Sequence, residues 1–111
     1  MNIHLNDDIF NIVLNGTKTV ECRLNDEKRR NLHVGDKLIF LKKSNEDEKI
    51  ESIVTELKYY KDFQELIENY SIEEVYLKEC SKEDFINLIN KFYTKEEQEQ
   101  YGVVAIRFKK I

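Results

Sequence analysis

Residues 12–40 read IVLNGTKTVECRLNDEKRRNLHVGDKLIF, and this stretch decides how the rest of the chain is arranged. Over residues 19–24 apolar and polar side chains alternate, which predicts a β-strand with two different faces. One face is apolar and carries Val20, Cys22 and Leu24; the other is polar and carries Thr19, Glu21 and Arg23. Such a strand can pack on one face and meet water or a ligand on the other.

A helix is predicted before this strand. Asn6 can cap the first free N–H groups, and the two aspartates that follow it favour the positive end of a helix. Apolar side chains then recur on one stripe, formed by Ile9, Phe10, Val13 and Leu14. Gly16 supplies a left-handed stop.

Two more strands are predicted after it. Residues 25–32 are polar and indicate a loop or one short helix, and a turn at 34–36 leads into a mostly apolar strand at 37–41. A polar, hairpin-like connection at 44–49 precedes a β-branched and aromatic strand at 50–60.

The second half of the chain reads as helical until its end. Capping signals mark helix starts at Asp62 with Glu65, Ser71 with Glu74, Ser81 with Asp84, and Thr94 with Glu97. The helices are expected to bury the stripes Phe63, Leu66, Ile67 and Tyr70, and Phe85, Ile86, Leu88, Ile89 and Phe92. From Gly102 the period becomes two, with Val104, Ile106 and Phe108 facing inward and Arg107 and Lys109 outward.

A C-terminal strand that follows a helical insert must pair with the earlier strands. The sequence therefore predicts an α+β fold, a small sheet or barrel of mixed strands with flanking helices. The 111 residues form one domain, 1–111, which is long enough to bury about 65% of the surface that the unfolded chain exposes.

Composition excludes several classes of protein. No apolar stretch approaches the ~20 residues of a membrane span, and no signal-peptide pattern begins the chain, so we expect a cytoplasmic protein without a membrane partner. Cys22 and Cys80 lack CxxC spacing and are expected to be reduced thiols. His4 and His33 have no partner at ligand spacing, and the chain has only three glycines, so we expect no metal and no cofactor.

Charge is distributed unevenly along the chain. The net charge is −4, which argues against a protein that coats nucleic acid generally. The segment 16–43 has eight basic and four acidic residues, a local excess of +4. This polarity suits a protein that meets an anion on one face, although a lysine-rich, solvated surface would give the same count.

Polar side chains gather around the first predicted strand, and two interpretations follow. The face that carries Glu21 and Arg23 is an exposed surface with weak ion pairs, or it lines a pocket in which the charges must pair. Strict alternation places Lys18 on the face of Val20. Lys18 can join Glu21 only if it lies in the turn before regular pleating begins.

Tyrosines offer a second signal. Tyr59, Tyr60, Tyr93 and Tyr101 could stack on bases, but a tyrosine near the end of a strand or helix more often belongs to the core. We expect Tyr59 and Tyr60 in the core and leave Tyr101 open.

The stretch 12–40 resembles the ASCH domain, a family of the PUA-like β-barrel superfamily. The family pattern G-x-K-[ST]-x-E-x-R, followed by a G-D turn, is matched by Gly16, Lys18, Thr19, Glu21, Arg23, Gly35 and Asp36. The closing segment EEQEQYGVVAIRF, residues 96–108, is similar to the end of bacterial members.

The resemblance implies a barrel with a cleft that binds RNA or a modified nucleoside. Some ASCH-like proteins are amidohydrolases acting on acetylcytidine, and some are reported as ribonucleases. Lys18 matches the catalytic lysine of the amidohydrolases, and Arg23 matches an arginine. Glu21 occupies the position of their threonine nucleophile, and the distant catalytic glutamate would be Glu73, Glu74 or Glu79.

Two functions remain open at this point. In the first, the protein binds RNA, a nucleoside or a nucleotide through Lys18, Thr19, Glu21, Arg23, Asn25, Arg29, Arg30 and Tyr101. In the second, it is a hydrolase in which Lys18 and Glu21 transfer protons. A third alternative, protein binding through the acidic helical half, rests on charge alone.

Overall fold

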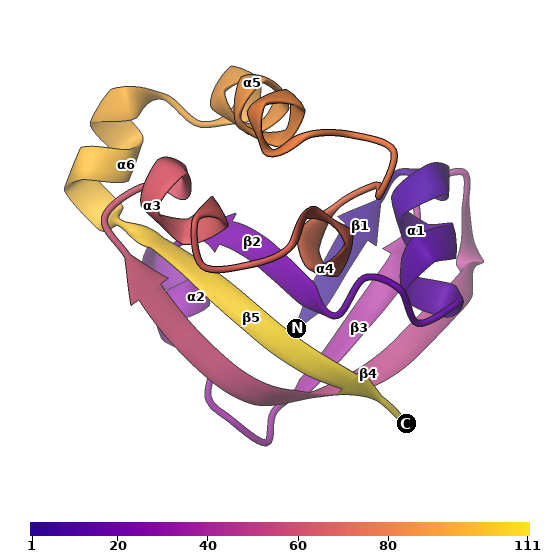
Figure 1. Cartoon of the computed structure of the whole chain (residues 1–111). Helices are drawn as coiled ribbons and strands as arrows, with labels where there is room; N and C mark the ends of the chain where they lie inside the picture. Colours follow the sequence, from indigo (N-terminus) through magenta and orange to yellow (C-terminus); the bar gives the residue numbers. More distant parts are fainter.

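The computed structural model describes all 111 residues, and its five strands form one curled sheet (Figure 1). The strands are β1 (Asn2–Leu5), β2 (Val20–Leu24), β3 (Lys37–Lys42), β4 (Asn45–Tyr60) and β5 (Val103–Lys110). Their order is β1-β3-β4-β5-β2, so β1 and β2 are the two edges. β1 runs parallel to β3, and the other neighbouring pairs are antiparallel. This half-barrel confirms the predicted α+β class and its mixed strands.

β5 lies between β4 and β2, which confirms that the C-terminal strand returns to the earlier sheet. Val104, Ile106 and Phe108 are buried on one face of β5, as predicted. Val103 and Ala105 are also buried, on the opposite face. β5 is therefore covered on both faces, by the interior of the curled sheet and by the helices.

β1 was not recognised in the sequence. It has four residues, with Ile3 and Leu5 buried between exposed neighbours, and it pairs with β3 in the register Ile3 to Phe40. A strand this short has too few residues to show a period, and its parallel partner lies more than thirty residues away in sequence. Only the folded sheet reveals it.

The predicted first helix is α1 (Asp7–Leu14), and it differs from prediction at both ends. The Asn6 side chain makes no capping hydrogen bond; instead the Asn6 carbonyl accepts from the Phe10 amide at 2.8 Å. Leu14 is 53% exposed because the last turn of α1 extends past the core. Gly16 has φ +87°, the left-handed conformation expected after a helix.

The connection predicted at residues 44–49 is mostly strand. β4 begins at Asn45, so the turn after β3 is short, and the register shifts between Leu41 and Lys42. Asn45 pairs with Lys42 and Lys49 pairs with Leu41, so the residues between them bulge out of the register. An ion pair between Lys42 and Glu48 at 3.3 Å also joins the two strands here.

The helices between β4 and β5 cover one side of the sheet (Figure 1). They are α3 (Phe63–Ile67), α4 (Ile72–Val75), α5 (Lys82–Phe92) and α6 (Lys95–Tyr101), and the short α2 (Glu27–Arg30) follows β2. Three of the four predicted capping signals form complete capping boxes, at Ser71, Ser81 and Thr94, and at the fourth the Asp62 side chain accepts from the Glu65 amide. The buried Gln98 side chain joins three of these helices. Its Oε1 accepts from the Phe63 amide at 3.1 Å, and its Nε2 donates to Asn90 Oδ1 at 3.1 Å.

Two apolar clusters form the core. The sheet cluster fills the inside of the curled sheet and contains Ile3, Leu5, Phe10, Val13, Leu32, Leu38, Phe40, Ile50, Val54, Val104, Ile106 and Phe108. The helix cluster lies between the sheet and α3 to α6 and contains Val20, Cys22, Leu24, Phe63, Leu66, Ile67, Tyr70, Val75, Phe85, Ile89, Val103 and Ala105.

Two aromatic side chains expected in the core are exposed. Tyr59 is 58% exposed near the end of β4, opposite Val104 of β5, and Phe92 is 68% exposed at the end of α5. Tyr60 packs against the helix cluster, as predicted. None of the helices is long and apolar enough to cross a membrane.

Candidate functional site

Lys18 lies in the turn between α1 and β2, not on the strand. Its backbone amide donates to the Ile12 carbonyl at 3.0 Å, which folds the turn back on α1. The side chain is 3% exposed. Its ammonium donates to the carbonyls of Val20 at 2.6 Å and Val75 at 2.7 Å and contacts Glu21 Oε1 at 3.1 Å. A lysine ammonium has three protons, so the protein itself occupies all of them.

Glu21 is buried between two cations. Lys18 contacts one of its oxygens, and Arg23 contacts the other through Nε at 2.9 Å and Nη2 at 2.8 Å. Burial by itself raises the pKa of the Glu21 carboxyl, but the Lys18 ammonium and the Arg23 guanidinium outweigh it and lower the pKa to about 2. Glu21 is therefore an anion at neutral pH, and two fixed cations balance it.

Arg23 is the part of this ion triad that is open to a ligand. Its side chain is 22% exposed, against 3% for Lys18 and 7% for Glu21. Burial tends to lower the pKa of Arg23, but the Glu21 carboxylate and the Tyr93 hydroxyl more than offset this and raise it. The guanidinium is fixed by Glu21 along one side and has the Tyr93 hydroxyl as a second neighbour, so only its exposed part is open to another acceptor.

The triad faces a pocket of about 450 Å³ that lies between the two edge strands of the sheet. His4 and Leu5 of β1 and Glu21, Cys22 and Arg23 of β2 line it, with α4 and α5 beside it. The volume is in the range of small-molecule sites. A closed barrel would have β1 paired with β2 at this position; in the half-barrel, the space between the two edges is the pocket.

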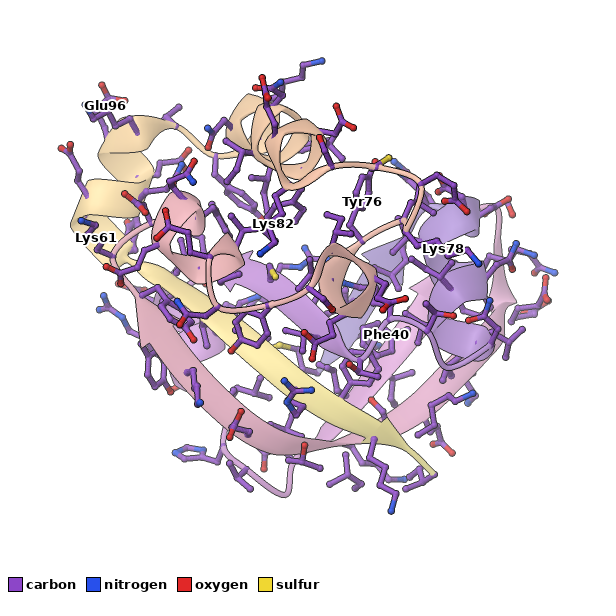
Figure 2. All side chains as sticks on the ribbon, in the orientation of Figure 1. Phe40, Lys61, Tyr76, Lys78, Lys82 and Glu96 are labelled. Carbon is purple, nitrogen blue, oxygen red and sulfur yellow. The ribbon has the colours of Figure 1, made fainter.

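The walls of the pocket are largely apolar and aromatic. Ten of its sixteen lining residues are hydrophobic, and the aromatic ones are Tyr76, Phe85, Phe92 and Tyr93. Tyr76 follows α4 directly, on the segment that leads to α5 (Figure 2). The Tyr93 ring stacks on Phe63, with centroids 5.5 Å apart and planes at 30°. The pocket thus combines an ionic floor with flat apolar walls.

The structure also accounts for Cys22, which lines the pocket. Its side chain is 6% exposed, and burial raises the pKa of its thiol to about 12. A thiol with this pKa is protonated at neutral pH and is a poor nucleophile. Cys22 and Cys80 are both free thiols.

The other sequence-predicted site residues lie outside the pocket. Asn25, Arg29, Arg30 and Tyr101 gather at the far end of β2, beside α2. The Arg30 guanidinium carbon lies 5.8 Å from the centre of the Tyr101 ring, and Arg30 Nε donates to the Asn25 carbonyl at 3.1 Å. The structure therefore brings Lys18, Glu21 and Arg23 together and places these four in a separate group.

Thr19 has a backbone role. Its amide donates to the Glu74 carbonyl at 3.0 Å, and its carbonyl accepts from the Phe108 amide at 3.2 Å. These two bonds, with the bond from Lys18 to the Val75 carbonyl, join the start of β2 to α4 and β5. The Thr19 side chain does not line the pocket.

None of the three candidate glutamates of the helical region lines the pocket. Glu74 contacts Arg107 at 3.4 Å and accepts from the Ser71 amide at 2.8 Å, and these contacts lower the pKa of its carboxyl against the effect of burial. Glu73 and Glu79 are exposed. The distant glutamate implied by the amidohydrolases has no counterpart at this site.

The basic excess of segment 16–43 does not form one positive face. Five of its eight basic residues are in ion pairs: Lys18, Arg23, Arg29, Lys37 and Lys42. Two of the partners, Glu48 and Glu51, belong to β4 and lie outside the segment. Tertiary pairing therefore removes much of the local charge that the sequence shows.

The aromatic walls were not identified in the sequence as part of a site. The stripe of α5 that contains Phe85 and Ile89 reads as core, and an apolar stripe looks the same whether it packs on a core or lines a cavity. The one usable signal for these walls was Tyr93, which the sequence analysis names among the tyrosines that could stack on bases. No group of three or more His, Cys, Asp or Glu side chains is placed to hold a metal ion.

Comparisons with known proteins agree on one family. A family model described as the ASCH domain matches residues 3–111. The crystal structure of hypothetical protein PH0355 is similar with a TM-score of 0.82 and 31% identity, covering 99% of this chain and 97% of that one. The solution NMR structure of protein PF0455 from Pyrococcus furiosus has a TM-score of 0.74 and 26% identity, with 100% and 98% covered. The search of curated proteins found no match.

Proposed function

Because the chain belongs to the ASCH domain family, we propose that its pocket binds one nucleotide unit of an RNA ligand, with the base against Arg23 and Glu21. Domains of this family generally bind RNA. The family does not say which residues of this chain make the contact. The proposal assigns it to the pocket between β1 and β2.

The main support for the proposal is that Arg23, the exposed member of the ion triad, lies next to the aromatic walls of the pocket. The exposed part of the Arg23 guanidinium is a donor, and Glu21 beside it is an acceptor that stays ionised. The edge of a nucleobase carries acceptors and donors side by side, and its faces stack on aromatic rings. The floor and the walls of the pocket offer these two kinds of contact together.

The three ionic residues have different roles in this proposal. Lys18 does not meet the ligand, because its ammonium is already bound to two carbonyls and to Glu21. It positions the Glu21 carboxylate and ties β2 to α4 through the Val75 carbonyl. Glu21 in turn holds the plane of the Arg23 guanidinium, which makes the main contact with the base.

The pocket is a better candidate than a charged surface. Non-specific binding to RNA depends on many phosphate contacts from lysine and arginine. Most basic residues of segment 16–43 are paired with carboxylates, and the whole chain has a net charge of −4. Recognition of one base in a pocket does not require a basic face.

The geometry does not favour the alternative of a hydrolase with Lys18 and Glu21 as a proton-transfer pair. A carboxylate whose pKa is about 2 is a weak base at neutral pH. Lys18 would have to give up a proton that is held between buried acceptors. The Cys22 thiol, with a pKa of about 12, is not a nucleophile at neutral pH either.

Arg23→Gln tests the proposal, because glutamine removes most of the donors while keeping a side chain of similar length. We expect at least a tenfold loss of affinity for short single-stranded RNAs, measured by fluorescence anisotropy at low salt. Arg30→Gln is the matched control: it removes the same charge from the same segment, outside the pocket. It should weaken binding less than threefold.

Equal losses in the two variants would mean that general charge attracts RNA and that the pocket does not read it. Wild-type protein that binds none of the four bases, even at low salt, would refute the proposal outright. Near-UV circular dichroism of each variant shows whether the fold is retained.

A further inference from the structure

Phe92 is an exposed aromatic side chain at the mouth of the pocket. It is the last residue of α5 and is 68% exposed, although the stripe to which it belongs buries Phe85 and Ile89. The other large apolar residues that are at least half exposed, Leu14, Val34, Tyr59 and Ile111, do not line the pocket. Phe92 alone combines exposure with a place in the pocket wall.

The residue that follows Phe92 connects it to the ion triad. Tyr93 also lines the pocket, and its hydroxyl is among the groups that raise the pKa of Arg23. Arg23 and Tyr93 are therefore neighbours in the pocket. Phe92 precedes Tyr93 in the chain and lines the same pocket, and its ring is the exposed one of the two.

The two ends of α5 differ in charge. Lys82, Glu83 and Asp84 begin the helix, and Lys91 is in its last turn. At 1.5 Å per residue, Asp84 and Phe92 are separated by about 12 Å along the helix. Lys91 is exposed and precedes Phe92 in the chain, so a cation is available for a phosphate at the Phe92 end.

From these placements we propose that Phe92 is a stacking platform for the nucleotide next to the one bound in the pocket. The inference rests on the proposed function and narrows it: the ligand is a strand of at least two nucleotides, not a free nucleoside. One base enters the pocket against Arg23, and the neighbouring base lies on the Phe92 ring as its phosphate leaves past Lys91. Stacking on aromatic side chains is tolerant of base identity, so the platform adds affinity more than sequence preference.

The test compares ligands of one and two nucleotides. The probes are the four ribonucleoside 5′-monophosphates and the same nucleotides extended by one adenosine on either side, titrated by isothermal calorimetry or by NMR. In the wild type we expect one extension of the nucleotide that binds best to raise the affinity at least tenfold. In Phe92→Ala this gain should fall to threefold or less, and Phe92→Trp should restore it.

Tyr59→Ala is the matched control, because it removes an exposed aromatic ring near the end of β4 that does not line the pocket. It should leave the tenfold gain intact. If the wild type binds the mononucleotides but gains nothing from the extension, or if Phe92→Ala keeps the whole gain, the platform is refuted while the proposed function stands. If no mononucleotide or extended nucleotide binds, the proposed function itself fails.

Phe92 could instead be the contact of a protein partner, such as a second copy of the chain. Sedimentation velocity of the wild type and of Phe92→Ala distinguishes that case. A dimer that Phe92→Ala dissociates, together with an unchanged gain from the extension, would overturn the platform and assign the ring to self-association.

Discussion

The sheet cluster and the helix cluster each contain twelve buried apolar residues, yet they contribute unequally to the pocket: Leu5 of the sheet cluster lines it, against Cys22, Val75, Phe85 and Ile89 of the helix cluster. Hydrogen-bonded strands and α1 enclose the sheet cluster. Short helices cover the helix cluster, and two of its members, Ile89 and Tyr70, are 9% and 8% exposed. A layer of short helices leaves spaces at their ends, whereas paired strands do not.

The buried ions lie on the border between the two clusters. Glu21 pairs with Ile106 and Arg23 with Val104, so both share the β5 face that belongs to the sheet cluster. Cys22 and its partner Ala105 belong to the helix cluster. The polar face of β2 is therefore the place where the interior of the curled sheet ends and the pocket begins. A site forms at this border because charges there can pair and still meet a ligand.

The largest expected effect separates the two clusters directly. Phe40 packs against Phe108, with ring centroids 4.8 Å apart, and Phe85 packs against Tyr76, with centroids 6.1 Å apart. Phe40 is the more deeply buried of the two. Phe40→Ala should lower the free energy of unfolding by about 3–5 kcal/mol, the cost of a large core truncation. Phe85→Ala should cost roughly half as much, because one side of its ring already faces the pocket. Urea unfolding at pH 7 measures both.

Equal losses in the two variants would mean that the helix layer is packed as tightly as the sheet, and the contrast between the clusters would disappear. Tyr59→Ala is the surface control and should change the free energy of unfolding by no more than about 0.5 kcal/mol.

The second effect concerns the border. Lys18→Met removes one cation from buried Glu21 and leaves two carbonyls without their donor, so we expect a loss of about 3 kcal/mol in urea unfolding. In Lys18→Met/Glu21→Leu the buried pair is replaced by apolar side chains, so the part of this loss that comes from the unpaired Glu21 charge should be recovered. The recovery is incomplete, because the two carbonyls still have no donor and Arg23 loses its partner. The exposed lysine of the Lys37–Glu51 pair is the control, and Lys37→Met should cost at most about 0.5 kcal/mol.

A double variant as unstable as Lys18→Met alone would show that the loss does not come from the unpaired charge of Glu21. In that case the buried charges would have no energetic effect that sets the border apart from the two apolar clusters.

The smallest effect is the dependence of stability on pH. The folded-state pKa of Glu21, about 2, is below its ordinary value of 4.5, so its contribution is complete above pH 5 and is lost as the pH falls toward 2. For this one group the linkage predicts a loss of about 1 kcal/mol by pH 4 and about 2 kcal/mol by pH 3. Urea unfolding of the wild type and of Lys18→Met/Glu21→Leu at pH 7, 4 and 3 isolates it. Between pH 7 and pH 3, the free energy of unfolding should fall less in the double variant than in the wild type, by these amounts. An equal fall in both proteins would contradict the lowered pKa of Glu21.

The ion triad shows how far sequence reasoning reached at the site. The alternation of residues 19–24 correctly separates Val20 and Cys22 from Glu21 and Arg23. Lys18 could be placed beside Glu21 only by assuming that it lies in the turn, and the structure places it there. Which of the two interpretations holds, exposed face or pocket, depends on what lies opposite the strand. That information is contained in β1, α4 and α5, all distant in sequence.

The residues that were misjudged share one physical cause. Leu14, Phe92 and Tyr59 have the right type and the right period for burial, but each lies beyond the element that would have covered it. Conversely, Val103 and Ala105 are buried on a face that alternation assigns to solvent, because the helices cover it. Periodicity reports which residues share a face, and it does not report whether a second layer reaches that face.

By itself, the sequence determined the local structure of this protein: its helix starts, its glycine stop after α1, the two faces of β2 and the return of the last strand. These follow from capping, from backbone conformation and from side-chain period, which act within a few residues. Only the tertiary structure decided that the sheet stays open between β1 and β2, that Lys18 is saturated by carbonyls, and that much of the basic excess is neutralised. Those outcomes depend on burial and on Coulomb pairing between segments far apart in the chain, which no short stretch of sequence contains.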